Sequence, residues 1–261
     1  MIDYCYHTHT YRCGHAIGRE EDYVKAAIDA GYKVIGFTEH VFLPDIEQPG
    51  IRGSYMELDD YIYTINNLKK KYKDKIEIHL GFECEYDEQL EDYYHYLKDV
   101  KGIEYFILGQ HLFYNGGELT WLSNAGAPEE MLEEYTATVI KAMKTGLFTY
   151  FAHPDLCLLF FKKITPYVES YLRKICEAAE YYNVPLEFNL GGLRNFRNDT
   201  RDHLKYPCEG FFEIMSHYNC KVIIGIDSHN PADFSNSDED IAYAESIIKK
   251  YNLHLINRLY I

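Results

Sequence analysis

Short apolar runs alternate with longer amphipathic stretches along the whole chain. Runs of this kind, rich in Val, Ile, Leu and Phe, are typical of buried strands, whereas apolar residues at helical spacing predict helices. The apolar runs predict seven strands, at residues 2–6, 34–37, 76–82, 105–108, 148–152, 185–189 and 222–226. Because the strands alternate with helices, we expect a parallel sheet.

The amphipathic stretches predict one helix after each strand, at residues 19–30, 57–72, 87–99, 128–145, 166–182, 209–218 and 238–250. The helix that Pro128 opens has the clearest apolar stripe, formed by Met131, Leu132, Tyr135, Val139, Ala142 and Met143. Glycine and proline or asparagine predict loops at 41–54 and around 115–117 and 124–126. No linker or repeat interrupts the pattern, so residues 1–261 are expected to form one domain.

A polar residue that can bind a metal ion or a substrate follows every predicted strand. These residues are, in chain order, His7 with His9, His40, Glu83, His111, His153, Asn189, and Asp227 with His229. A closed barrel brings the carboxyl ends of all its strands to one mouth, whereas an open sheet leaves its edge strands far from the site. We therefore predict a distorted (β/α)7 barrel, similar to a TIM barrel, with a metal site at the C-terminal ends of the strands.

The donor set indicates the chemistry of this site. With His15, which follows Cys13 and Gly14, it contains seven histidines, one glutamate and one aspartate. Imidazole with carboxylate suits zinc, manganese or iron. Three protein ligands are typical of one catalytic zinc ion, so nine donors are enough for three ions if a carboxylate bridges two of them. Cys13 fits a loop thiol as well as a ligand.

Two further acidic residues lie beside the predicted donors in the sequence. Glu39 precedes His40 and is predicted to orient a ligand without binding the metal itself. Glu85 follows Glu83 at a spacing of two but lies further into a loop, so we expect it at the surface.

Charge and cysteine content limit the partners and the compartment. The formal net charge of −15 disfavours long nucleic acid. It does not exclude a small phosphorylated substrate, because metal ions can reverse the local field. Seven cysteines without a CxxC pattern predict reduced thiols. With no signal-like leader or membrane-length apolar run, we expect a cytoplasmic protein, and the oligomeric state stays open.

Eight short motifs together carry a resemblance to a known family. They are His7-Thr8-His9, Cys13-Gly14-His15-Ala16, Phe37-Thr38-Glu39-His40, Gly81-Phe82-Glu83, Gly109-Gln110-His111, Ala152-His153-Pro154-Asp155, residues 189–194 and residues 225–229. On these motifs the sequence resembles the PHP (polymerase and histidinol phosphatase) family, within it the histidinol-phosphatase branch, over essentially the whole chain. One departure is Glu39, where the family more often has aspartate.

The resemblance implies three divalent ions. The first is expected to be bound by His7, His9, Glu83 and Asp227. The second is expected to be bound by Glu83, as a bridge, with His111 and His153. The third is expected to be bound by His15, His40 and His229. Because no ligand position is substituted, the resemblance predicts an active enzyme.

The resemblance also implies an activity, the hydrolysis of L-histidinol phosphate to L-histidinol and phosphate in histidine biosynthesis. A hydroxide that bridges the first two metal ions would attack phosphorus. Asp227 is a candidate proton shuttle to the leaving alkoxide. Arg194, in the Gly-Leu-Arg motif, is the first candidate for binding phosphate. Further candidates are Lys162, Lys163 and Arg52, whereas Arg197 is expected to be exposed.

Two other functions are compatible with the sequence. The first is a PHP phosphoesterase that acts on a different small phosphate ester or on a nucleotide. The second is a metal-binding barrel without catalytic activity, which the complete set of ligand positions disfavours.

Overall fold

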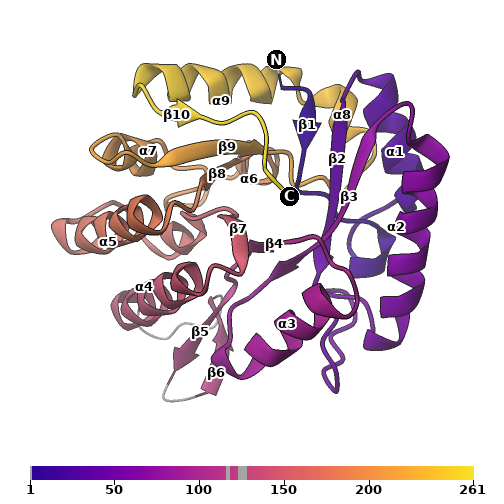
Figure 1. Ribbon diagram of the computed structural model, residues 1–261. Coiled ribbons are helices and arrows are strands. Elements are labelled where there is room, and N and C mark those ends of the chain that lie inside the picture. Colours follow the sequence, from indigo (N-terminus) through magenta and orange to yellow (C-terminus); the bar gives the residue numbers. More distant parts are fainter. Residues whose placement is uncertain (1, 116–117, 123–127) are drawn as a thin grey trace.

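The centre of the protein is a curled parallel sheet of eight strands (Figure 1). The computed structural model describes residues 2–115, 118–122 and 128–261. In spatial order the strands are β1 (Tyr4–Cys5), β2 (Val34–His40), β3 (Glu77–Cys84), β4 (Tyr105–Leu108), β7 (Phe148–Phe151), β8 (Leu186–Asn189), β9 (Lys221–Gly225) and β10 (His254–Leu255). Each strand pairs in parallel with its neighbour, as the alternation of apolar runs and helices predicts.

Helices surround this sheet on its outer side (Figure 1). They include α1 (Glu20–Asp29), α2 (Leu58–Tyr72), α3 (Glu91–Asp99), α4 (Pro128–Thr145), α5 (Pro166–Tyr182), α7 (Glu209–Met215) and α9 (Asp238–Lys250). The predicted apolar stripe of α4 is buried along its whole length. Among the described residues, no helix is long and apolar enough to cross a membrane.

The segments that follow the first strand, β1, and the last but one, β9, are joined at the mouth. Thr8, just after β1, forms an isolated parallel bridge with Ser228, just after β9. The His9 amide donates to the Ser228 carbonyl oxygen at 2.9 Å, and the Ser228 amide donates to the His7 carbonyl oxygen at 3.2 Å. At the opposite end β10 pairs with β9, and the Tyr4 hydroxyl donates to the carbonyl oxygen of Ile256 at 3.1 Å. The bridge therefore places the first and last polar motifs side by side.

The fold class is confirmed, but several connections differ from the prediction. A hairpin of β5 (Leu112–Asn115) and β6 (Glu118–Trp121) occupies part of a predicted loop, whereas 116–117 and 124–126 lie outside the described residues. Strand β10 was missed because a two-residue strand carries no periodic pattern. The short helices α6 (Leu190–Phe196) and α8 (Asp233–Asn236) were also missed. In α6 the Asn189 side chain caps the Gly192 amide, at 2.8 Å, which offsets the helix-breaking tendency of its glycines.

The interior of the sheet requires a close approach between β2 and β4. All seven residues of β2 are buried, as expected for a parallel strand covered on both sides. The hydroxyl of Tyr105 donates to the Tyr6 carbonyl oxygen at 2.9 Å and fills the space beside Gly36. A Cβ atom at position 36 would lie 2.1 Å from that hydroxyl oxygen. Only glycine leaves enough room here.

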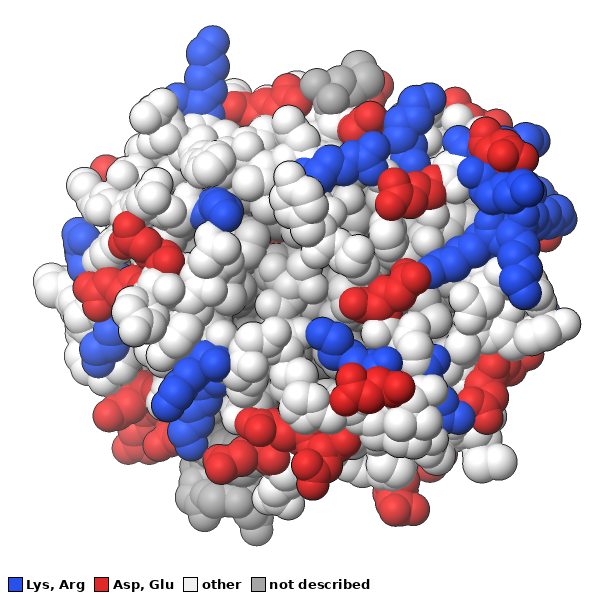
Figure 2. Space-filling view, in the orientation of Figure 1, with Lys and Arg blue, Asp and Glu red and all other residues white. Residues whose placement is uncertain are grey.

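The exposed side chains on the face shown in Figure 2 are mixed in charge. Acidic and basic side chains both occur over this face with uncharged areas between them, and several basic side chains gather at the right of the view. The formal net charge of −15 belongs to the whole chain, and this face carries side chains of both signs.

We expect Gly36→Ala to lower the free energy of unfolding by about 1–3 kcal/mol, because the new methyl group overpacks the contact with Tyr105. A urea titration measures this difference. The matched control is Gly210→Ala in α7, whose Cβ would meet the flexible end of the Ile164 side chain. The control should change the unfolding free energy by less than about 1 kcal/mol. Equal stability of the Gly36 variant and the wild type would contradict the packing argument.

Candidate metal centre

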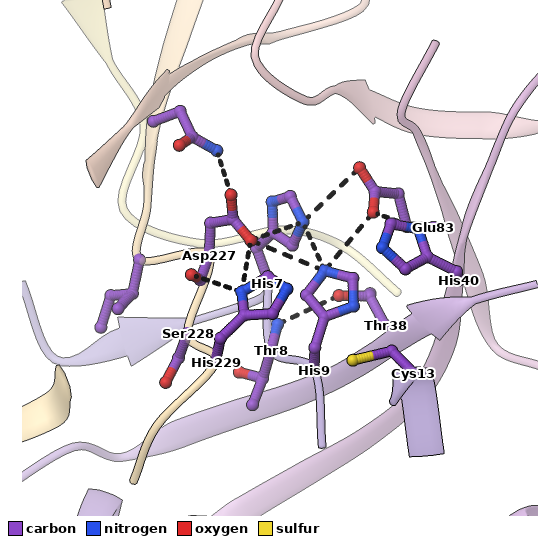
Figure 3. A network of polar contacts seen from close by, with 12 residues as sticks. His7, Thr8, His9, Cys13, Thr38, His40, Glu83, Asp227, Ser228 and His229 are labelled. Atoms are coloured by element: carbon purple, nitrogen blue, oxygen red, sulfur yellow. Dashed lines mark hydrogen bonds and ion pairs between the residues drawn. The ribbon is translucent and has the colours of Figure 1, made fainter. Parts of the chain in front are cut away.

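The mouth of the sheet contains a cavity of about 540 Å³ that collects the predicted donors. Eight of the nine line it: His9, His15, His40, Glu83, His111, His153, Asp227 and His229. The ninth, His7, is fully buried, with its Nε2 atom 3.1 Å from Nε2 of His9. Side chains that follow strands far apart in the sequence therefore converge at one point (Figure 3).

Four donor atoms have the spacing of ligands to a single ion. Nε2 of His7 lies 3.5 Å from Oδ1 of Asp227, and Nε2 of His9 lies 3.6 Å from the same oxygen. Oε2 of Glu83 is 3.4 Å from Nε2 of His9. Ligands at about 2.0–2.2 Å from a tetrahedral ion are separated by about 3.3–3.6 Å. This geometry and the mixture of imidazole and carboxylate fit a divalent metal ion.

Glu83 lies between two groups of imidazoles. Its Oε1 atom is 2.8 Å from Nε2 of His153 and 3.8 Å from Nε2 of His111. Its Oε2 atom faces His9 and lies 3.0 Å from Nδ1 of His40. The carboxylate is thus placed to be shared between two ions.

The surroundings of Glu83 favour its charged form. Burial alone would raise the pKa of its carboxyl, but the imidazoles of His40, His7 and His111 lower that pKa well below its usual value. A Cβ atom at position 109 would lie 2.0 Å from Oε1, so glycine is required beside the carboxylate.

A second pair of imidazoles faces the solvent side of the mouth. Nε2 of His15 lies 3.1 Å from Nε2 of His229. Nδ1 of His15 faces the carbonyl oxygens of Cys13 and Gly50, at 3.2 and 3.1 Å, which directs Nε2 towards His229. The ring of His40 lies 5.6 Å from that of His15. A donor atom of His40 also lies within 4.8 Å of donor atoms of His9 and His229, so a third ion bound by His15, His40 and His229 stays a prediction.

Cys13 and Glu39 lie directly behind this group. The Cys13 thiol is buried and donates to the Thr10 carbonyl oxygen at 3.2 Å, while its sulfur lies within 4.8 Å of donor atoms of His15 and His229. The Glu39 carboxylate accepts from the Thr10 amide at 2.6 Å, and burial raises its pKa to about 8. Glu39 therefore holds the chain immediately after His9.

Glu187, which the sequence pattern did not indicate as a site residue, lies behind His7. Its Oε1 accepts from Nδ1 of His7 at 2.8 Å, and its Oε2 accepts from the His153 amide at 3.0 Å. The Asn189 side-chain amide donates to the same Oε2 at 2.7 Å. The sequence did contain a signal for Glu187, since it is a charged residue in an otherwise apolar strand. It lies two positions before Asn189, and alternate residues of a strand share a face, so both side chains point to the same side.

Asp227 sits in a strained turn that Arg194 supports. Its backbone has φ of 50°, in the left-handed region. Nη2 of Arg194 donates to the carbonyl oxygens of Ile226 and Asp227 at 2.7 and 2.8 Å, and its Nη1 is buried with no partner among the residues that the structure describes. Burial would raise the pKa of Asp227, but His7 and His229 keep it below its usual value. Arg194 also lines the cavity.

The other basic candidates lie outside the cavity lining. Lys162 is exposed, and its ammonium pairs with Asp202 at 2.8 Å. Lys163 is also exposed. Neither position supports phosphate binding, which stays a prediction for both. Arg197 is exposed, as expected.

Arg52 and Glu85 differ more sharply from expectation. Glu85 was predicted at the surface, and this prediction is wrong, because the side chain is buried between Arg52 and His111. Arg52 is itself buried and does not line the cavity.

Comparisons with known proteins agree with this geometry. The family model described as PHP domain matches residues 6–190. A protein of Deinococcus radiodurans named "Probable histidinol-phosphatase" is 24% identical over 231 residues, covering 87% of this chain and 86% of its own length. The histidinol-phosphatase of Bacillus subtilis is 27% identical over 215 residues, covering 72% of this chain and 80% of its own length.

A solved structure shares the fold over nearly the whole chain. It is the crystal structure of histidinol phosphate phosphatase from Lactococcus lactis, complexed with zinc, L-histidinol and phosphate. The TM-score is 0.72 and the identity 21%, and the match covers 99% of each chain.

We expect Glu187→Gln to weaken zinc binding by about 10–100-fold. The glutamine NH₂ group would face the two donors that now bind Oε2, and a neutral amide oxygen opposite Nδ1 would make His7 a weaker ligand. Competition with a chromophoric chelator measures the affinity. Glu213→Gln, at an exposed site in α7, is the matched control and should bind zinc as the wild type does. Wild-type affinity in the Glu187 variant would refute this supporting role.

Proposed function

The chain belongs to the PHP family of metal-dependent phosphoesterases, and on this premise we propose that it is a phosphomonoesterase that hydrolyses L-histidinol phosphate. The observation that carries the proposal is the position of Glu83 in the cavity lining, where its Oε1 faces His153, His7 and His111 and its Oε2 faces His40 and His9. The histidinol-phosphatase relatives and the complex of the Lactococcus lactis enzyme with histidinol and phosphate support this choice of substrate.

The donor groups define which residues would hold the ions. We assign His7, His9, Glu83 and Asp227 to the first ion, Glu83, His111 and His153 to the second, and His15, His40 and His229 to the third. Bound divalent ions supply positive charge for the phosphate oxygens and lower the pKa of water towards neutrality, which provides the nucleophile.

Two residues of the chain complete the proposed reaction. The unpartnered Nη1 of Arg194 is a donor for a phosphate oxygen, because guanidinium groups bind phosphate through charge-assisted hydrogen bonds. The Asn189 side chain donates to Oδ2 of Asp227 at 3.2 Å and fixes the orientation of that carboxylate. In this orientation Asp227 is our candidate for passing a proton to the leaving alkoxide.

The rest of the cavity suits a small organic leaving group. A volume of about 540 Å³ is within the range of small-molecule sites. Ile17, Leu156 and Tyr206 provide an apolar wall, and Asn195 and Asn230 add hydrogen-bonding groups. This combination is compatible with an imidazole ring that carries a short polar chain.

The two alternatives have less support. Another small phosphate ester would also fit the cavity, and the choice between esters rests on the relatives. Long nucleic acid is disfavoured by the net charge of −15. A metal-binding barrel without activity is disfavoured because all nine donor positions are filled by residues able to bind metal.

We expect removal of metal by a chelator to abolish hydrolysis of histidinol phosphate, and added zinc, manganese or iron to restore it. Phosphate release, measured on histidinol phosphate and a panel of other phosphate esters, tests both the metal dependence and the choice of substrate. Full turnover by metal-free protein would refute the metal-dependent reaction. Similar kcat/KM on every ester would favour the broader phosphoesterase.

We expect Arg194→Gln to lower kcat/KM for histidinol phosphate by about 10–100-fold, because one charge-assisted hydrogen bond to phosphate is lost. The neighbouring Arg197→Gln is the matched control, since Arg197 is exposed and pairs with Asp240. Steady-state kinetics at saturating metal measure the effect. Equal losses in the two variants would argue against a specific role of Arg194.

A further inference from the structure

The long connection between β2 and α2, residues 41–54, contacts two of the proposed donor groups from behind. One contact is direct, from the Gly50 carbonyl oxygen to Nδ1 of His15 at 3.1 Å. The other runs through Arg52 and Glu85 to His111. This segment therefore contacts a histidine of the third group directly and is linked to a histidine of the second group through Glu85.

Arg52 holds this connection in place. Its Nη1 donates to the Val41 carbonyl oxygen at 2.9 Å and its Nε donates to Oε1 of Gln48 at 2.6 Å. Its Nη2 donates to Oε2 of Glu85 at 3.1 Å. All three guanidinium nitrogens thus have partners within the protein, and the residue is 97% buried with only 3% of its surface exposed. Three of the five N–H donors of the guanidinium are thus used within the protein, and Arg52 does not line the cavity.

Glu85 transmits the contact to the metal centre. Its Oε1 accepts from Nδ1 of His111 at 3.0 Å, which leaves Nε2 of that ring facing Glu83 at 3.8 Å. A carboxylate behind a metal-binding histidine fixes the tautomer and the ring orientation. Without Arg52, the buried Glu85 carboxylate would lose its cationic partner.

We propose that Arg52 is a positioning residue of the metal centre: through Glu85 it orients His111, and through the 41–54 connection it keeps the Gly50 carbonyl against His15. This assignment replaces the role in phosphate binding that the sequence suggested for Arg52. It rests on the metal centre proposed above. Lysine cannot substitute, because one ammonium group does not reproduce the planar fork that reaches three separate acceptors.

Zinc binding by full-length Arg52→Met, Arg52→Lys and Glu85→Gln, measured by chelator competition and metal analysis, tests the assignment. We expect part of the bound zinc to be held about 10–100-fold more weakly in Arg52→Met, with little recovery in Arg52→Lys. At least one zinc per chain should keep wild-type affinity, because His7 is held by Glu187 and not by Arg52. At saturating metal, KM for histidinol phosphate should equal that of the wild type.

The matched control is Arg201→Met, since Arg201 is also a loop arginine paired with a carboxylate, that of Asp199, but is exposed. It should bind zinc as the wild type does. If Arg52→Met does not fold, Glu85→Gln decides, and wild-type zinc affinity in that variant overturns the assignment. A raised KM with unchanged zinc affinity in Arg52→Met also overturns it and restores the phosphate-binding role. Failure of the wild type to bind zinc would instead refute the metal centre itself.

Discussion

The structure depends on one buried carboxylate, Glu83, that is surrounded by imidazoles. A buried charge is costly unless opposite charges or strong donors compensate it, so the surrounding chain must deliver those partners to one point. The register of β2 against β3 places His40 opposite Glu83, and Gly109 leaves the space that the carboxylate fills. The same requirement makes the site suitable for metal ions, because the imidazoles that stabilise the carboxylate are themselves ligands.

A second layer of carboxylates supports the imidazoles from behind. Glu187 binds His7 from one side of the mouth, and Glu85 binds His111 from the other. Both are buried, and each is held by further donors, Asn189 in one case and Arg52 in the other. The orientation of the histidines is therefore built into the fold, which lowers the cost of arranging them when an ion binds.

Basic residues in loops were the least predictable part of the site. Arg52 and Lys162 look equivalent in the sequence, since each lies in a loop after a strand and near the predicted mouth. In the structure one is buried against Glu85 and the other pairs with Asp202 at the surface. A long flexible side chain takes the partner that the fold brings near, and local sequence carries no signal for that partner. Arg194 differs because it lies in α6, directly after a strand end.

The sequence by itself determined the parallel architecture and the position of eight candidate donors after the strands, because periodicity and strand ends are local properties of the chain. Only the tertiary structure decided which donors face each other across the mouth, since Thr8 and Ser228 meet through a bridge that no local pattern encodes. It also decided the supporting roles of Glu187, Glu85 and Arg52, and the place of β10. Those assignments depend on contacts between residues far apart in the chain. Burial and charge pairing can select these contacts only once the strands are assembled.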